Sequence, residues 1–130
     1  MDWTTINETM QRMARERKDE LAGKRTALLP KLRKLGIEQI EATYDGYGDS
    51  GNIEDVILFP EGVRGDAALE ANQLEGLEDF LWAVAYNLNP GFEINDGAYG
   101  EISWDLRTDR IDVSHSERFT DTRYSEHEDV

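Results

Sequence analysis

Residues 37–59 read IEQIEATYDGYGDSGNIEDVILF, and within them the hydrophobic pattern of the chain changes. Over residues 40–44 apolar and polar side chains alternate, which is typical of a strand with one buried face. A second apolar run, at 53–59, follows the glycine-rich middle of the stretch. We therefore expect a β-hairpin whose loop is longer than a two-residue turn.

The residues before this hairpin show a helical period instead. Pro30 should kink or restart the helix because proline cannot donate a backbone hydrogen bond, and Gly36 should end it. We expect a long amphipathic helix and then a short one from about Pro30 to Leu35. The apolar residues that recur at helical spacing are Ile6, Met10, Met13, Leu21, Leu28, Leu32 and Leu35.

Three further elements are expected after the hairpin. Residues 60–71 have no clear period and predict a surface connection, whereas 74–88 carry a regular helical stripe. Residues 102–106 and 111–113 alternate as two strands joined by a turn. The predicted fold class is α+β: a long N-terminal helix, then β-β-α-β-β, forming an antiparallel four-stranded sheet with helices on one face.

Length and composition predict one domain over residues 1–130. Within it we distinguish a basic helical arm at 1–35, an α+β core at 36–119 and an acidic polar tail at 120–130. The chain has no cysteine, which excludes disulfides, thiolate metal sites and a cysteine nucleophile. It also shows no apolar leader or long apolar run, so we expect a cytoplasmic protein.

The charge is negative and unevenly distributed. The formal net charge is −14. Residues 1–35 hold nine Lys/Arg against five Asp/Glu, and residues 36–130 hold five against twenty-three. Such a field repels nucleic acid and anionic membranes and attracts basic proteins. It also favours solubility, so charge alone leaves both interpretations open.

The predicted strand order brings three acidic segments to one end of the sheet. These are the loop within the hairpin, the exit of the second helix near 89–97, and the segment from 117 onward. Carboxylates with nearby aromatic anchors form a plausible recognition surface. Its predicted partner-binding residues are Asp45, Tyr47, Asp49, Glu54, Asp96, Tyr99, Glu101 and Glu117.

Two specific interpretations of the Gly-Asp-Ser-Gly sequence at 48–51 fail. A serine protease needs a histidine base and a fold much longer than this chain, and His115 alternates with strand residues. Ser50 is better explained as capping or bracing the loop. An EF-hand loop counted from Asp45 needs glycine in sixth place and an acid in twelfth, where this chain has Ser50 and Val56.

A divalent-metal site of another type stays open, because hard cations bind clustered carboxylates. A metal-dependent hydrolase with His115 or His127 as acid or base is therefore one alternative function. Turn chemistry by itself is the favoured explanation of the Asp-Gly pairs in these loops. The candidate metal ligands are Asp45, Asp49, Asp96 and Glu117, with Glu101 as a further candidate.

Three motifs in order resemble a family of small bacterial proteins. They are DGxGDSGxIE at 45–54, NDGAYG at 95–100 and ERFTDxxYxxH at 117–127. The family is catalogued as a domain of unknown function, with members in proteobacterial genomes, plasmids and phage-like elements, and the resemblance covers roughly residues 20–128. The chain departs from it at Ile94, where a polar residue is expected. The resemblance implies one recurrent unit and, through mobile elements, a counter-defence role of the anti-CRISPR kind.

We therefore expect a non-enzymatic, acidic protein-binding factor, either counter-defence or regulatory, that occupies a basic, nucleic-acid-like site on a partner protein. No catalytic residue, cofactor, membrane contact or direct contact with nucleic acid is expected. Two alternatives stay open. One is the metal-dependent hydrolase, and the other is an oligomeric scaffold in which residues 5–35 join copies of the chain.

Overall fold

A computed structural model describes residues 3–47, 50–88, 97–117 and 123–130. The strands form one sheet in the order β3-β2-β1-β4-β5-β6, and every neighbouring pair is antiparallel. This confirms the predicted α+β class with a long first helix. The elements are α1 (Trp3–Lys34), β1 (Gln39–Tyr47), β2 (Ser50–Phe59), β3 (Val63–Arg64), α2 (Gly65–Ala68), α3 (Ala71–Leu88), β4 (Ala98–Asp105), β5 (Arg110–Glu117) and β6 (Arg123–His127).

The predicted four-stranded sheet is wrong, because the sheet has six strands. β3 and α2 lie in the stretch predicted as a surface connection at 60–71, and each is too short to show a sequence period. β6 lies in the stretch predicted as a polar tail and reads RYSEH, without the apolar alternation that would mark a strand. Backbone pairing with β3 and β6 therefore extends the sheet on both sides.

The first helix is continuous through Pro30, instead of being divided there as predicted. Pro30 and Thr26 are both exposed, so the helical hydrogen bond that proline cannot make is lost on the solvent side. Leu28 and Leu32, on either side of the proline, pack in the core and hold the two parts in line. Gly36, at φ 83°, then ends the helix as predicted. No helix in the described ranges has the length and apolar character needed to cross a membrane.

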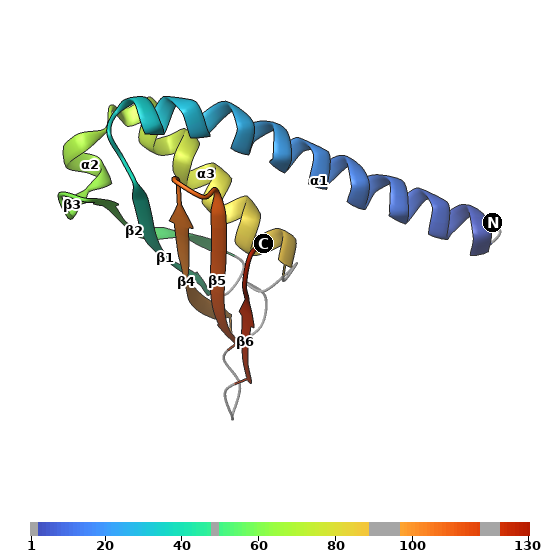
Figure 1. Cartoon of the computed structure of the whole chain (residues 1–130). Coiled ribbons are helices and arrows are strands. Elements are labelled where there is room, and N and C mark those ends of the chain that lie inside the picture. The colour runs from blue at the N-terminus through green and yellow to red at the C-terminus, as the bar shows by residue number, and fades with distance from the viewer. Residues whose placement is uncertain (1–2, 48–49, 89–96, 118–122) are drawn as a thin grey trace.

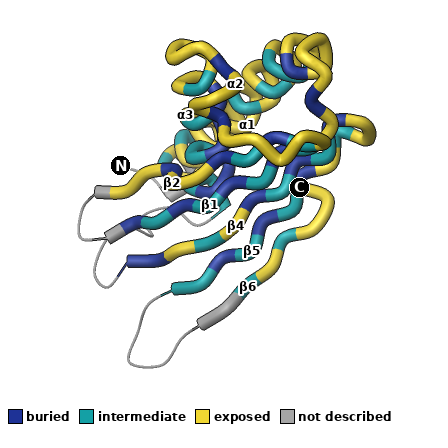
Figure 2. Tube along the Cα trace, turned by 90° about the vertical axis from the view of Figure 1, so that its left-hand side faces the viewer, coloured by how far each residue is buried: buried dark blue, intermediate teal, exposed yellow. Residues whose placement is uncertain are grey.

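The core lies between α3 and one face of the sheet (Figure 1). The apolar stripe predicted over 74–88 is confirmed, and its buried members include Leu77, Phe80 and Leu81. These pack in one cluster with alternate residues of the central strands, such as Ile40 of β1 and Trp104 of β4. Figure 2 shows the three helices on the same side of the sheet.

Asp109, in the turn between β4 and β5, links the sheet to α1. Its Oδ1 accepts hydrogen bonds from Arg25 Nε of α1 at 2.9 Å and from Trp104 Nε1 at 2.9 Å. Arg25 also donates to the carbonyl groups of Asp109 and Val130. The backbone of Asp109 is left-handed, with φ 56°, a conformation that Asp tolerates better than most residues.

Replacing Asp109 with alanine should lower the free energy of unfolding by about 2 kcal/mol, mainly because the buried Trp104 indole loses its acceptor. The ion pair with Arg25 is partly exposed and should contribute less. Asp109→Asn should cost about 1 kcal/mol, since it keeps an oxygen acceptor and tolerates the left-handed backbone. Urea unfolding followed by tryptophan fluorescence measures both variants, and negligible losses in both would contradict this role.

Candidate functional site

One face of the sheet has no described helix over it (Figure 2), and many of its side chains are acidic. Along β1, residues 40, 42 and 44 are buried under the helices, so the residues between them point to the opposite side. We call this side the open face. The pairing of neighbouring strands shows which of their residues lie on the same face. The acidic residues of the open face are Glu41, Asp45, Asp55, Glu101, Asp105, Asp112 and Glu126.

A single row of open-face residues crosses five strands. Asp55 of β2 pairs with Thr43 of β1, which pairs with Glu101 of β4. The row continues through Ser114 of β5 to Glu126 of β6. Because neighbouring strands lie about 4.8 Å apart, each carboxylate of the row stands about 10 Å from the next. All three carboxylate residues of the row are exposed.

Residues next to this row add an aromatic ring and a fixed carboxylate. Tyr99 of β4 pairs with Asp45 of β1, and Tyr99 is 44% exposed. On the other side of the row, Glu41 Oε1 accepts hydrogen bonds from Gln39 Nε2 at 2.6 Å and Ser103 Oγ at 3.0 Å. The open face therefore presents both hydrogen-bonded carboxylates and an apolar contact surface.

Two further open-face carboxylates are held in the ionised form. The backbone N–H of Asp129 and the Arg110 side chain donate to Asp112, and these hydrogen bonds hold the pKa of Asp112 below its ordinary value. The backbone N–H and side chain of Arg107 do the same for the pKa of Asp105. Both groups therefore carry negative charge at neutral pH.

The predicted site residues divide between the two sides of the sheet. Asp45, Tyr99 and Glu101 lie together on the open face. Glu117 pairs with Ala98, whose side chain is buried, and so lies on the helix-covered side. Glu54 lines a hollow beside α2 and α3 together with Arg64 and Glu78. Asp49 and Asp96 lie outside the described residues, as does the side chain of Tyr47.

The register also shows how the three acidic segments are arranged. Gly46 of β1 pairs with Ala98 of β4, and Ala98 pairs with Glu117 of β5. The strand ends that lead into the three segments therefore adjoin one end of the sheet, as the strand order predicted. Their side chains nevertheless point to two different faces.

Sequence reasoning missed several open-face acids: Glu41, Asp55, Asp105, Asp112 and Glu126. The period-two pattern of β1 contains the signal for Glu41, because it separates the buried positions from the others. The period-two pattern does not reveal that Asp55 belongs to the open face. A bulge shifts the register of β1 and β2 between Thr43 and Tyr44 and brings Asp55, instead of Glu54, opposite Thr43.

On the helix-covered side, Tyr44 and His115 form a buried pair in which each residue is 1% exposed. The Tyr44 hydroxyl lies 2.6 Å from His115 Nδ1, and the two rings stack at 5.8 Å. Burial raises the pKa of the Tyr44 phenol far above its ordinary value and lowers the pKa of His115. We therefore assign the phenol as donor and the neutral imidazole as acceptor. Gly100 lies against this pair, and a Cβ there would collide with the Tyr44 ring.

Glu117 lies on the other side of the same imidazole. Its Oε1 is 3.9 Å from His115 Nε2, which carries the proton when Nδ1 accepts from Tyr44. The charge of Glu117 raises the pKa of His115, but the effect of burial is larger. Because Tyr44 and His115 are almost completely covered, they act in the described structure as a packed part of the sheet.

The metal interpretation is limited by the same division between the two faces. Asp45 and Glu117 point to opposite sides of the sheet, while Asp49 and Asp96 lie outside the described ranges. Among the side chains that the structure describes, no three histidines or acids form a group that could hold a metal ion. A metal site at the loops stays a prediction.

Comparison with known proteins identifies a family for most of the chain. The model of a family of unknown function (DUF6878) matches residues 21–75 and 64–129. The chain belongs to this family, which confirms the predicted membership in a domain of unknown function. The matched region begins at Leu21, the residue of α1 at which packing against the core begins. No curated protein and no solved structure matches the chain.

Tyr44→Phe should reduce the free energy of unfolding by about 1–2 kcal/mol, because His115 Nδ1 loses its donor while the ring contacts stay. The matched control is Tyr99→Phe, which makes the same change in a residue that is 44% exposed and should cost less than about 0.5 kcal/mol. Urea unfolding compares the two variants. A loss in Tyr44→Phe no greater than in the control would contradict the buried hydrogen bond.

The stability of the fold should depend on the protonation of His115. Because the pKa of His115 is lower than its ordinary value of 6.5, the unfolded chain binds a proton more readily than the folded one. The contribution of His115 should be complete above pH 6.5 and should be lost progressively as the pH falls towards the folded-state pKa. Urea unfolding between pH 7.5 and pH 5 should therefore show a shallower pH dependence in His115→Gln. An unchanged pH dependence in that variant would be evidence against a neutral buried imidazole.

Proposed function

We propose that the protein is a non-enzymatic binding factor whose open face engages a basic surface of a partner protein. The row of Asp55, Glu101 and Glu126 across five adjacent strands is the observation that carries this proposal. Asp45 lies on the same face and adds negative charge on one side of the row, and on the other side Asp112 is paired with Arg110.

The sheet presents these charges in a fixed pattern. Alternate residues of one strand are about 6.8 Å apart, and neighbouring strands are about 4.8 Å apart. Their backbones are held by the hydrogen bonds of the sheet, so binding would require little ordering of the main chain. Tyr99, exposed beside Asp45, supplies the kind of aromatic anchor that contributes strongly to protein interfaces.

The partner that suits this surface is a protein rich in Arg and Lys. Carboxylates accept charge-assisted hydrogen bonds from these side chains in the same way as phosphates do. The net charge of −14 would also increase the rate of encounter with such a partner. We extend the proposal to a basic partner site that otherwise holds nucleic acid, which the protein would occupy in its place.

A decaarginine peptide is a defined probe for this surface. Asp45→Lys combined with Glu101→Lys should weaken peptide binding about tenfold or more, equivalent to about 1.4 kcal/mol. The matched control is Glu75→Lys with Asp79→Lys, which changes the net charge equally on exposed positions of α3. Titration calorimetry at low salt measures all three proteins. We expect the control to stay close to the wild type, and added salt to weaken the wild-type complex.

Equal losses in the two double variants would show that the peptide responds only to net charge and would overturn the proposal. Binding that persists at high salt would do the same. The two variants can then serve as baits in lysate of the host cell. A basic protein retained by the α3 control and lost by the open-face variant would be the expected partner.

A further inference from the structure

The outer edge of β2 is covered along only part of its length. β3 pairs with Ile57 and Leu58 of β2, and the chain then leaves this edge as α2 begins at Gly65. No other strand in the described ranges pairs with that side of β2. Residues 51–55 therefore have no strand beside their outer side, and four of these five residues are exposed. We call residues 51–55 the free edge.

An uncovered strand edge can bind another segment of extended chain. It presents backbone N–H and C=O groups that pair with a further strand. Proteins use such edges to bind extended peptides, and main-chain hydrogen bonds supply the affinity. The side chains of the added strand alternate between the two faces of the sheet. The side chains beside the free edge therefore decide which sequence it binds.

The side chains beside the free edge are acidic on both sides. Asp55 lies on the open face, and Glu54 lines a hollow of about 120 Å³ next to α2 and α3. Asp66 and Glu78 line the same hollow together with one cation, Arg64. Burial raises the pKa of Glu78 above its ordinary value. A cation entering this hollow would stabilise the ionised form of Glu78.

The chain itself shows how a basic residue fits this edge. Arg64 of β3 pairs with Ile57 of β2, and its Nη2 atom lies 3.7 Å from Oδ1 of Asp55, two residues further along β2. Diagonal contacts of this kind are typical of neighbouring strands. Arg64 is 63% exposed, so its ion pair is weak and leaves Asp55 available to a stronger partner. A basic strand beside the free edge would therefore repeat a contact that β3 already makes.

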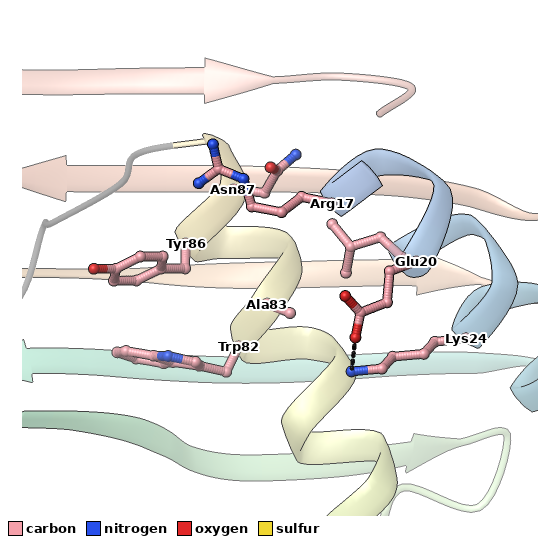
Figure 3. A pocket seen from close by; sticks show the side chains of 8 residues that line it. Arg17, Glu20, Lys24, Trp82, Ala83, Tyr86 and Asn87 are labelled. Carbon is pink, nitrogen blue, oxygen red and sulfur yellow. Dashed lines mark ion pairs between the residues drawn. The ribbon is translucent and has the colours of Figure 1, made fainter. Parts of the chain in front are cut away.

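The hollow between α1 and α3 has the opposite balance of charge. It has a volume of 270 Å³, and its lining includes Arg17 and Lys24 but only one described acid, Glu20. Glu20 already pairs with Lys24 at 3.5 Å (Figure 3). A basic side chain would be repelled there. Charge complementarity thus favours the free edge over this hollow as the place for a basic segment.

We propose that the free edge binds an extended segment of a partner protein, rich in Lys or Arg, as an added β-strand. Basic side chains on one face of the added strand would contact Asp55, and those on the other face would enter the hollow beside Glu54. The free edge of a second copy is a poor occupant, because it would bring like charges together. The inference goes beyond the proposed function of the open face, since it concerns a different surface and an extended form of partner.

Titration calorimetry with the peptide Lys-Val-Lys-Val-Lys-Val-Lys tests this binding. The same peptide, N-methylated at every backbone nitrogen, keeps its charges but cannot donate main-chain hydrogen bonds, so it should bind at least about tenfold more weakly. Glu54→Lys should weaken binding of the unmodified peptide by a similar factor. The matched control is Glu16→Lys, which changes the net charge equally at an exposed position of α1 and should stay close to the wild type. Thermal unfolding checks that both variants fold.

Hydrogen exchange locates the peptide on the sheet. Binding should slow the exchange of backbone N–H groups within residues 51–55, because these groups gain hydrogen-bond partners. A wild type that does not bind the unmodified peptide, equal binding of the two peptides, or protection confined to other strands would overturn the proposal. The open face is tested separately through Asp45 and Glu101, so either proposal can fail without the other.

Discussion

The packing of α3 against one face of the sheet is the constraint on which the remaining structure depends. Alternate residues of the central strands, among them Ile40 and Trp104, must be apolar because they lie under Leu77 and Phe80 of α3. The same alternation leaves the other residues of each strand facing away from the helices. The acidic open face is thus the direct counterpart of the core, and its geometry is as rigid as the packing that supports it.

Much of the core could be predicted from the sequence, because its elements have strong periods. The stripe of α3 and the alternation in β1, β4 and β5 identify most of the buried residues. The weak elements were not predictable in this way. β3 has two residues and β6 is polar, so both depend on backbone hydrogen bonds, which leave no mark in the pattern of side chains. Pro30 predicted a break that the first helix does not have. Packing of the helix on either side of Pro30 overrides the local preference of proline to interrupt a helix.

The candidate site was also predictable only in part. The strand order correctly brought the strand ends near Gly46, Ala98 and Glu117 to one end of the sheet. It could not show that Asp45 and Glu117 point to different faces, because this depends on the residue-by-residue register. The sequence also could not show the bulge beside Thr43. This bulge places Asp55, instead of Glu54, opposite Thr43 on the open face. Loop composition pointed to the end of the sheet, whereas the structure places seven acids along the open face.

The two outermost strands have a consequence for how copies of the protein meet. An unprotected edge strand can pair with another sheet and begin aggregation, and proteins avoid this with short or charged edges. On one side β3 (Val63–Arg64) covers only Ile57 and Leu58 of β2, and the uncovered part of β2 carries exposed Glu54 and Asp55. The other edge strand carries exposed Glu126. Both edges therefore discourage continuation of the sheet from one molecule to the next. A flat acidic face can in this way stay accessible in a crowded cell without the sheet becoming a template for fibrils.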